Sequence, residues 1–125
     1  MTRPVCLIVD DSLVTRLVGR QIAESLGFTC IEAADGTQAV TACNQNMPQV
    51  ILLDWNMPHL SGFESMLQIR QLPHGKTPII IFCTAEHDAA KMADALNSGA
   101  NEYIIKPFNA DVVRDKFIMT GAIHG

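Results

Sequence analysis

The sequence contains no long apolar run and no excess of positive charge. None of its apolar segments reaches the roughly 18 residues that a membrane-spanning helix requires, and residues 1–4 lead directly into a short apolar segment. Thirteen acidic residues outnumber nine lysines and arginines, which are scattered along the chain, and the net charge is −4. A domain that binds nucleic acid would instead need a clustered basic face. We therefore expect a soluble cytoplasmic protein that binds neither a membrane nor nucleic acid.

Metal-ligand spacings of cysteine and histidine are absent as well. No two cysteines form a Cys-x-x-Cys motif and the histidines share no ligand spacing, so neither a zinc site nor a redox pair is indicated. The cysteines lie in apolar segments and are expected as buried, reduced thiols, whereas the histidines lie in polar segments and are expected at the surface. The residues concerned are Cys6, Cys30, Cys43, Cys83, His59, His74, His87 and His124.

What the chain does contain is a regular alternation of two patterns. Short apolar runs typical of strands buried on both faces occur at residues 5–9, 50–53 and 78–83, and two further short strands are expected at 28–33 and 102–105. Helical patterns follow them at residues 13–26, 37–46, 61–72, about 86–98, and after a cap at 109. Five strands alternating with five helices predict one doubly wound α/β domain with a parallel sheet and right-handed crossovers. With 125 residues, 48% of them hydrophobic, the chain can bury one core without disulfides.

Two of the predicted helices carry apolar stripes, which ordinarily face the core. The stripe of the first helix comprises Leu13, Val14, Leu17, Val18, Ile22 and Leu26. The stripe of the fourth comprises Ala89, Met92, Ala93 and Leu96. Both assignments depend on residue spacing alone.

Polar residues stand where four of the predicted strands end. Asp10 and Asp11 follow the first strand, Asp54 the third, Thr84 the fourth and Lys106 the fifth. Parallel strands place these ends on one edge, where α/β folds bind ligands. Two carboxylates about 4 Å apart repel by roughly 4 kcal/mol at an effective dielectric constant near 20, and one lysine cannot offset three acids. Either some of the acids are protonated or a divalent cation belongs there, and oxygen ligands without histidine or cysteine suit Mg²⁺.

Each of these residues alone has an ordinary structural interpretation. The acid pair can cap the following helix, Thr84 can be a hydrogen-bonded residue at a strand end, and Lys106 can be a surface lysine. Their joint placement favours a site. A carboxylate can act as a nucleophile toward a phosphoryl group, with metal and lysine balancing the charge, and Asp54 is the candidate nucleophile.

Four blocks of sequence carry a family resemblance. They are Val9-Asp10-Asp11-Ser12, Leu53-Asp54-Trp55-Asn56-Met57-Pro58, Thr84-Ala85-Glu86 and Lys106-Pro107-Phe108. In order and spacing they resemble the receiver domains of response regulators, most closely the single-domain, CheY-like chemotaxis type. The resemblance covers the whole chain and implies a flavodoxin-like (βα)5 fold with strand order 2-1-3-4-5. It also implies a receiver over residues 1–125 with no separate effector domain.

The resemblance assigns roles at the site. Asp54 would accept a phosphoryl group from a phosphohistidine on a sensor histidine kinase or a histidine phosphotransfer protein. Mg²⁺ would be held by Asp11, Asp54 and the backbone carbonyl of Asn56, with Asp10 reaching it through water. Lys106, joined to Pro107 by a cis peptide bond, would contact the phosphoryl group. Such a protein is a switch that catalyses only its own phosphorylation and dephosphorylation.

The resemblance also implies an output. Thr84 and Tyr103 would reorient together and reshape the face made by the fourth helix, fifth strand and fifth helix, which would bind a downstream protein. A flagellar motor protein is one candidate target, and we expect a monomer. Asn56 and Glu86 would tune the lifetime of the acyl phosphate. Ser61 departs from the family, since many relatives have aspartate there, and the apolar tail after residue 117 leaves the partner surface open.

Three other functions compete with this interpretation. A phosphorelay shuttle or phosphate sink would use the same chemistry without an output target. A phosphatase of the haloacid-dehalogenase type would need a second acid two residues after its nucleophile, where this chain has Asn56. Flavin binding would need a phosphate cradle of Gly, Ser and Thr where the strand-end loops hold acids.

Overall fold

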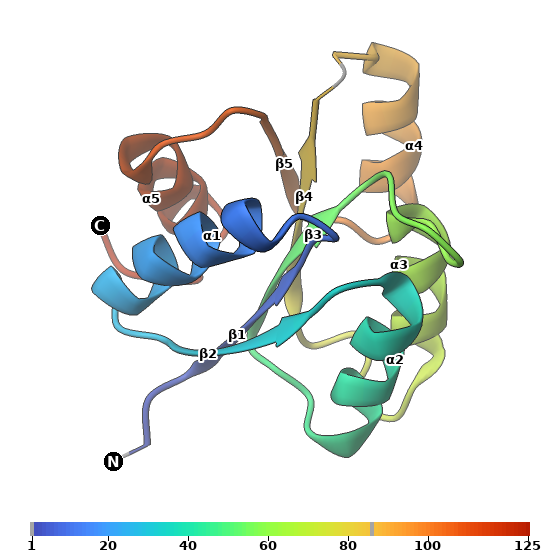
Figure 1. Ribbon diagram of the computed structural model, residues 1–125, viewed down its shortest axis with the longest axis horizontal. Coiled ribbons are helices and arrows are strands. Elements are labelled where there is room, and N and C mark those ends of the chain that lie inside the picture. Colours follow the sequence, from blue (N-terminus) through green and yellow to red (C-terminus); the bar gives the residue numbers. More distant parts are fainter. Residues whose placement is uncertain (1, 86) are drawn as a thin grey trace.

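The computed structural model describes residues 2–85 and 87–125, and it has five strands and five helices in strict alternation within these ranges (Figure 1). Each boundary lies within a few residues of the sequence prediction. The elements are β1 (Val5–Val9), α1 (Leu13–Ser25), β2 (Thr29–Ala33), α2 (Gly36–Gln45), β3 (Val50–Asp54), α3 (Gly62–Gln71), β4 (Ile79–Thr84), α4 (Ala89–Ser98), β5 (Glu102–Ile105) and α5 (Ala110–Met119).

The helices begin where a short polar side chain can accept hydrogen bonds from backbone amides that have no partner inside the helix. This N-terminal capping occurs at all five helices, and in each the side chain accepts from an amide in the first turn. The capping residues are Ser12, Asp35, Ser61, Asp88 and Asn109.

The strands form one parallel sheet in the order β2-β1-β3-β4-β5, as predicted. Helices α1 and α5 cover one face and α2, α3 and α4 the other (Figure 1). This order makes β1 and β3 neighbours, with Val9 beside Leu53 at their carboxyl ends. The chain leaves β1 in one direction and β3 in the other, which opens a crevice between them.

Two hydrophobic clusters hold the layers together. Ile8 and Leu52 of the sheet pack with α1 and α5, where Phe28 meets Phe117 edge to face with ring centroids 5.4 Å apart. The opposite cluster joins β1, β3 and β4 to α2, α3 and α4. Because both faces are covered, the central strands are apolar throughout and lack the alternation of a half-exposed sheet.

The predicted core face of α1 is wrong for its first half. Leu13, Val14, Leu17 and Val18 are 57%, 71%, 45% and 40% exposed, and the buried residues of α1 are Gly19, Ile22 and Ala23. The helix faces the sheet through half-buried Thr15 and Arg16 in its first turns. These polar side chains bond to the segment between β1 and α1, so the apolar stripe there points outward.

The fourth helix also differs from its prediction. It begins at Ala89, because the Asp88 carboxylate accepts hydrogen bonds from the amides of Ala90 and Lys91. Glu86, where the helix was expected to begin, lies outside the described residues. Of the predicted stripe only Met92 is buried. The helix meets the sheet through Met92 and Ala95, a narrower contact than periodicity suggested.

The predictions for cysteine and histidine are confirmed. All four cysteines are free thiols in the core, and the four histidines are exposed. Burial raises the pKa of Cys43 to about 11 and that of Cys83 to about 12, so both thiols stay protonated at neutral pH. Among the described residues, no helix is both long and apolar enough to cross a lipid bilayer.

Candidate functional site

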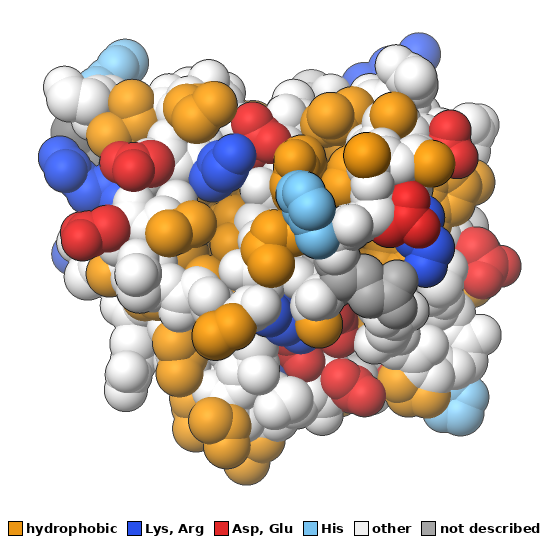
Figure 2. Space-filling model, turned by 90° about the horizontal axis from the view of Figure 1, so that it is seen from above, with side chains coloured by type: hydrophobic (Ala, Val, Ile, Leu, Met, Phe, Trp, Pro, Cys, Tyr) orange, Lys and Arg blue, Asp and Glu red, His pale blue; other side chains and the backbone are white. Residues whose placement is uncertain are grey.

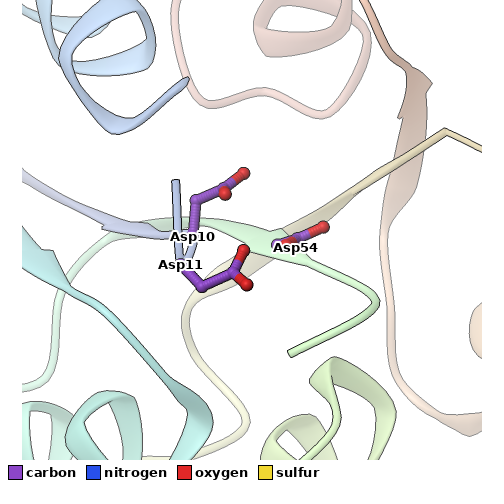
Figure 3. Close-up of side chains that lie close together, drawn as sticks. All are labelled: Asp10, Asp11 and Asp54. Atoms are coloured by element: carbon purple, nitrogen blue, oxygen red, sulfur yellow. The ribbon is translucent and has the colours of Figure 1, made fainter. Parts of the chain in front are cut away.

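Three carboxylates converge at the carboxyl edge of the sheet (Figure 3). Asp10 and Asp11 directly follow β1, and Asp54 is the last residue of β3. Each offers an oxygen atom, and these oxygens lie within 4.8 Å of one another. Asp10 and Asp54 are only 3% and 6% exposed, whereas Asp11 is exposed. The convergence follows from neighbouring parallel strands that both end in acid.

A single ammonium group bridges two of the acids. The Nζ atom of Lys106 lies 2.7 Å from Oδ2 of Asp10 and 3.0 Å from Oδ1 of Asp54. Lys106 follows β5, and its amide donates to the carbonyl of Thr84 at the end of β4. The next peptide bond, to Pro107, is cis, as the resemblance implied. The side chain of Lys106 therefore extends from the end of β5 past the end of β4 to Asp54 at the end of β3.

Burial and neighbouring charges have opposing effects on the pKa values of Asp54 and Lys106. Burial is the largest effect on Asp54 and raises its pKa; the hydrogen bond from Lys106 lowers it, and the charges of Asp10 and Asp11 raise it further. The net result is a pKa above the ordinary value. Burial alone would lower the pKa of Lys106, but its bonds to Asp10 and Asp54 outweigh burial and raise it. Lys106 is therefore a permanent cation at neutral pH.

The donor set fits a hard divalent cation. Both oxygens of Asp10 are engaged, since Oδ1 accepts from the amide of Ser12 at 2.9 Å and Oδ2 accepts from Lys106. Among the described residues, no hydrogen bond or ion pair engages the Asp11 carboxylate. Exposed Asp11 and strand-end Asp54 thus remain to ligate, and carboxylate oxygens with water are the ligands that Mg²⁺ prefers.

The other predicted site residues lie around this cluster. Thr84 is buried at the end of β4, and Asn56 is exposed in the loop after β3. Tyr103 is half-buried on β5, with the Nζ atom of Lys116 5.4 Å from its ring centroid. The roles assigned to these three residues stay predictions. Glu86 lies outside the described residues.

Trp55 lies directly behind the candidate nucleophile. Its ring is half-buried, with centroids 4.8 Å from Phe82 and 5.7 Å from Phe63. The side chain that follows Asp54 thus packs against Phe63 of α3 and Phe82 of β4. Being the only tryptophan, it can report optically on the site.

Two residues at the site have no role in the sequence prediction. Arg16 donates from Nη1 to the backbone carbonyl of Asp10 at 2.7 Å, and Gly62 at the start of α3 approaches the carbonyl of Asp54 so closely that a Cβ atom would overlap it. An arginine in a helix carries no local sign of such a contact. For Gly62 the sequence predicts only that it lies at the start of a helix.

Comparison with known proteins gives a consistent result. The profile of the response regulator receiver domain matches residues 6–118. The chemotaxis protein CheY of Pseudomonas aeruginosa is 33% identical over 111 residues, which are 88% of this chain and 90% of that protein. CheY of Bacillus subtilis is 34% identical over 108 residues, 86% of this chain and 88% of that protein.

Solved structures agree in fold. CheY4 of Vibrio cholerae superposes with a TM-score of 0.89 at 28% identity, covering 95% of this chain and 99% of that one. The receiver domain of the sensor histidine kinase PA1611 from P. aeruginosa, solved with a magnesium ion in its active-site cleft, has a TM-score of 0.83 at 30% identity, covering 96% and 99%. CheY in the CheX–CheY–BeF3–Mg complex of Borrelia burgdorferi has a TM-score of 0.88 at 30% identity, covering 94% and 88%.

Proposed function

The chain belongs to the response regulator receiver domain family, and we propose that it is a phosphoacceptor switch in which Asp54 takes a phosphoryl group from a phosphohistidine. The donor would be a sensor histidine kinase or a histidine phosphotransfer protein. One observation carries the proposal: the Asp54 carboxylate, at the rigid end of β3, lies 3.0 Å from a lysine ammonium and within a cluster of two further acids. An acid held in this way can attack phosphorus while its surroundings absorb the transferred charge.

The transfer exchanges one bond to phosphorus for another. An Asp54 oxygen forms a bond to phosphorus, the nitrogen–phosphorus bond of the phosphohistidine breaks, and the imidazole leaves with the bonding electron pair. Asp11, Asp54 and the carbonyl of Asn56 would hold Mg²⁺, with Asp10 reaching it through water, and the bound ion would supply positive charge for the phosphoryl oxygens. Lys106 already donates to Asp54, so its ammonium is placed to follow the negative charge from the carboxylate to the phosphoryl group.

The output would follow from the new charge. In this proposal the hydroxyl of Thr84 approaches the phosphoryl group and Tyr103 changes its packing, which reshapes the surface of α4, β5 and α5. Lys116 lies over the Tyr103 ring and 3.4 Å from Glu102, so its contacts would change when Tyr103 moves. Similarity to chemotaxis proteins supports a chemotaxis target, with the flagellar motor as a candidate.

An apolar surface beside the site supports a protein as the phosphodonor. The outward side chains of α1 border a groove of about 360 Å³, and its lining also includes Lys106, Pro107 and Phe108. In the view from above, basic and acidic side chains lie close together near the lower centre with hydrophobic ones around them (Figure 2). A donor whose histidine reaches Asp54 must cover this rim, and hydrophobic contact with α1 would hold it there.

The test is phosphoryl transfer with and without Asp54. Wild type and Asp54→Asn are incubated with Mg²⁺ and a radiolabelled histidine kinase or acetyl phosphate, with Asp115→Asn as a control for an exposed acid on α5. We expect label that base and hydroxylamine release on wild type and the control and none on Asp54→Asn, together with a Trp55 fluorescence response to beryllofluoride that needs both Mg²⁺ and Asp54. Label retained by Asp54→Asn, or no labelling of wild type, would refute the proposal.

A shuttle or phosphate sink remains the alternative output. It differs in that the phosphoryl group returns to a histidine and no target binds the phosphorylated form. Net flow of label from one kinase to a second would favour it, whereas phosphorylation-dependent capture of a single target would favour the switch.

A further inference from the structure

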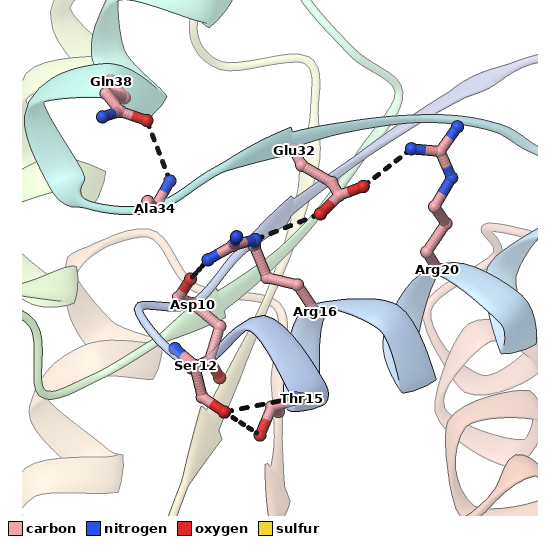
Figure 4. A network of polar contacts seen from close by, with 8 residues as sticks. All are labelled: Asp10, Ser12, Thr15, Arg16, Arg20, Glu32, Ala34 and Gln38. Carbon is pink, nitrogen blue, oxygen red and sulfur yellow. Dashed lines mark hydrogen bonds and ion pairs between the residues drawn. The ribbon is translucent and has the colours of Figure 1, made fainter.

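Every polar group of Asp10 is fixed by a partner. Its amide donates to the carbonyl of Ala33 at 3.2 Å, and its carboxylate oxygens accept from Ser12 and Lys106. Its carbonyl accepts from Nη1 of Arg16 at 2.7 Å, the contact that Figure 4 shows. The first three contacts belong to the sheet, the helix cap and the acid cluster. The fourth, from Arg16, is not explained by any of these.

Arg16 is itself held from the other side. Its Nε atom lies 3.0 Å from Oε1 of Glu32 on β2, and the second oxygen of Glu32 lies 2.7 Å from Nη1 of Arg20. The side chains of Arg16 and Glu32 are only 15% and 24% exposed, so the pair has a fixed geometry. Hydrogen bonds, first from Arg20 and then from Arg16, lower the pKa of Glu32 and keep it charged. The guanidinium fork thus joins β2 to the segment that follows β1.

The contact reaches Asp11 through one peptide plane. The carbonyl of Asp10 and the amide of Asp11 are parts of the same planar unit, so fixing the direction of the carbonyl limits rotation of the backbone that carries Asp11. Among the described residues, no hydrogen bond or ion pair engages the Asp11 carboxylate itself. The aim of this exposed side chain at Asp54 therefore depends on its backbone.

We propose that Arg16 is a positioning residue for cation binding: through the carbonyl of Asp10 it directs the Asp11 carboxylate toward Asp54. The inference rests on the proposed function, since it takes Mg²⁺ as the ion. The positive charge of Arg16 by itself repels a cation, so placement of Asp11 and charge have opposite effects on binding. If placement is the larger effect, removal of Arg16 weakens Mg²⁺ binding; if charge is the larger effect, removal strengthens it.

The chain offers a matched control in Arg20. Arg16→Met and Arg20→Met make the same chemical change on the same helix, and each removes a bond to Glu32. Only Arg16 also donates to the carbonyl of Asp10. Mg²⁺ is titrated into each protein without a phosphodonor, by Trp55 fluorescence and by calorimetry, which does not depend on the tryptophan. We expect the Mg²⁺ dissociation constant of Arg16→Met to rise about tenfold, as for other residues that orient metal ligands, and that of Arg20→Met to change less than about twofold.

Arg16→Lys keeps the charge but cannot donate to Glu32 and the carbonyl as a fork, so its affinity should lie between those of Arg16→Met and wild type. Urea unfolding without metal shows which variants are folded. If Arg16→Met does not fold, the same comparison is made between Arg16→Lys and Arg20→Lys. If the Arg16 and Arg20 variants bind Mg²⁺ with equal affinity, or if the Arg16 variant binds it more tightly than wild type, the role of Arg16 is refuted but the proposed function is not. A wild type that binds no Mg²⁺ would instead refute the proposed function.

Discussion

At the scale of single residues, the site is held in an unfavourable electrostatic state. Asp54 is nearly buried beside two acids, and the ammonium that compensates it is shared with Asp10. A buried carboxylate with a shared partner is poorly solvated, which disfavours its charged form. The charge of Asp54 therefore lowers the free energy of unfolding of the metal-free protein. A bound cation or a phosphoryl group would change this effect.

Replacement of Asp54 should therefore stabilise the metal-free protein. An acid whose pKa is raised by folding favours the native state fully only below its ordinary pKa, and this contribution is lost as the pH rises through the folded value. At pH 7 without metal, Asp54→Asn should increase the free energy of unfolding by about 1 kcal/mol, and the difference should shrink near pH 4. Urea unfolding at both pH values measures it.

The control for this prediction is Asp115→Asn, which replaces an exposed acid on α5 and should not stabilise the protein at pH 7. A metal-free Asp54→Asn protein that is less stable than wild type at pH 7 would contradict the argument. It would mean that the bond to Lys106 outweighs burial and the neighbouring acids.

The residues of the acid cluster could be predicted because they follow strands directly. The rule that parallel strands end on one edge brings Asp10, Asp11, Asp54 and Lys106 together without side-chain detail. Arg16 could not be predicted in this way. Its contact depends on how α1 lies over the sheet, and no local pattern records that position.

At the scale of elements, the loop between β3 and α3 is fixed by a close approach. The amide of Gly62 donates to the carbonyl of Trp55 at 2.8 Å, and a Cβ atom there would overlap the Asp54 carbonyl and lie 3.0 Å from Cα of Trp55. Both neighbours are backbone and cannot turn aside. The start of α3 thus rests directly on the residue that bears the candidate nucleophile.

Gly62→Ala should consequently damage both stability and the site. We expect a loss of about 2 kcal/mol in the free energy of unfolding, in the range for overpacked positions, together with weaker Mg²⁺ binding. Gly19→Ala is the comparison: its Cβ would lie 3.3 Å from a methyl group of Ile8, which can shift, and alanine favours the helix. Denaturant unfolding and metal titration of both variants measure the difference. A Gly62→Ala protein as stable as Gly19→Ala would contradict it.

Periodicity predicted where the helices lie but not which side of them is buried. The first half of α1 turns Thr15 and Arg16 to the sheet and leaves Val14 71% exposed, because the loop beneath it needs hydrogen bonds. In α4 the buried side is Met92 with Ala95, and the start is set by the cap at Asp88. Hydrophobic spacing identifies a helix, whereas its rotation depends on what lies under it.

At the scale of the whole molecule, the site is assembled from the ends of four strands. Asp10 and Asp11 follow β1, Asp54 ends β3, Thr84 ends β4 and Lys106 follows β5. The unfolded chain cannot bring these groups together, so a cation that needs them binds only the native state. Its binding energy is then also folding energy.

Mg²⁺ should accordingly protect the entire domain from unfolding. At one hundred times its dissociation constant, Mg²⁺ should add about 2.7 kcal/mol to the free energy of unfolding of wild type. Asp11→Asn lacks one proposed ligand and should gain much less. Urea unfolding with MgCl2 and with NaCl at equal ionic strength separates specific binding from screening. An equal gain in Asp11→Asn would show that the ion binds elsewhere.

The bridge from Lys106 to Asp54 also has a consequence for biosynthesis. The two residues are 52 positions apart, and every acid of the cluster is translated before the lysine. A nascent chain that has completed β3 therefore carries the mutual repulsion of three carboxylates without their ammonium partner. Docking of β1 on β3 should therefore be less favourable before β5 is synthesised than in the complete sheet, where Lys106 supplies the compensating charge.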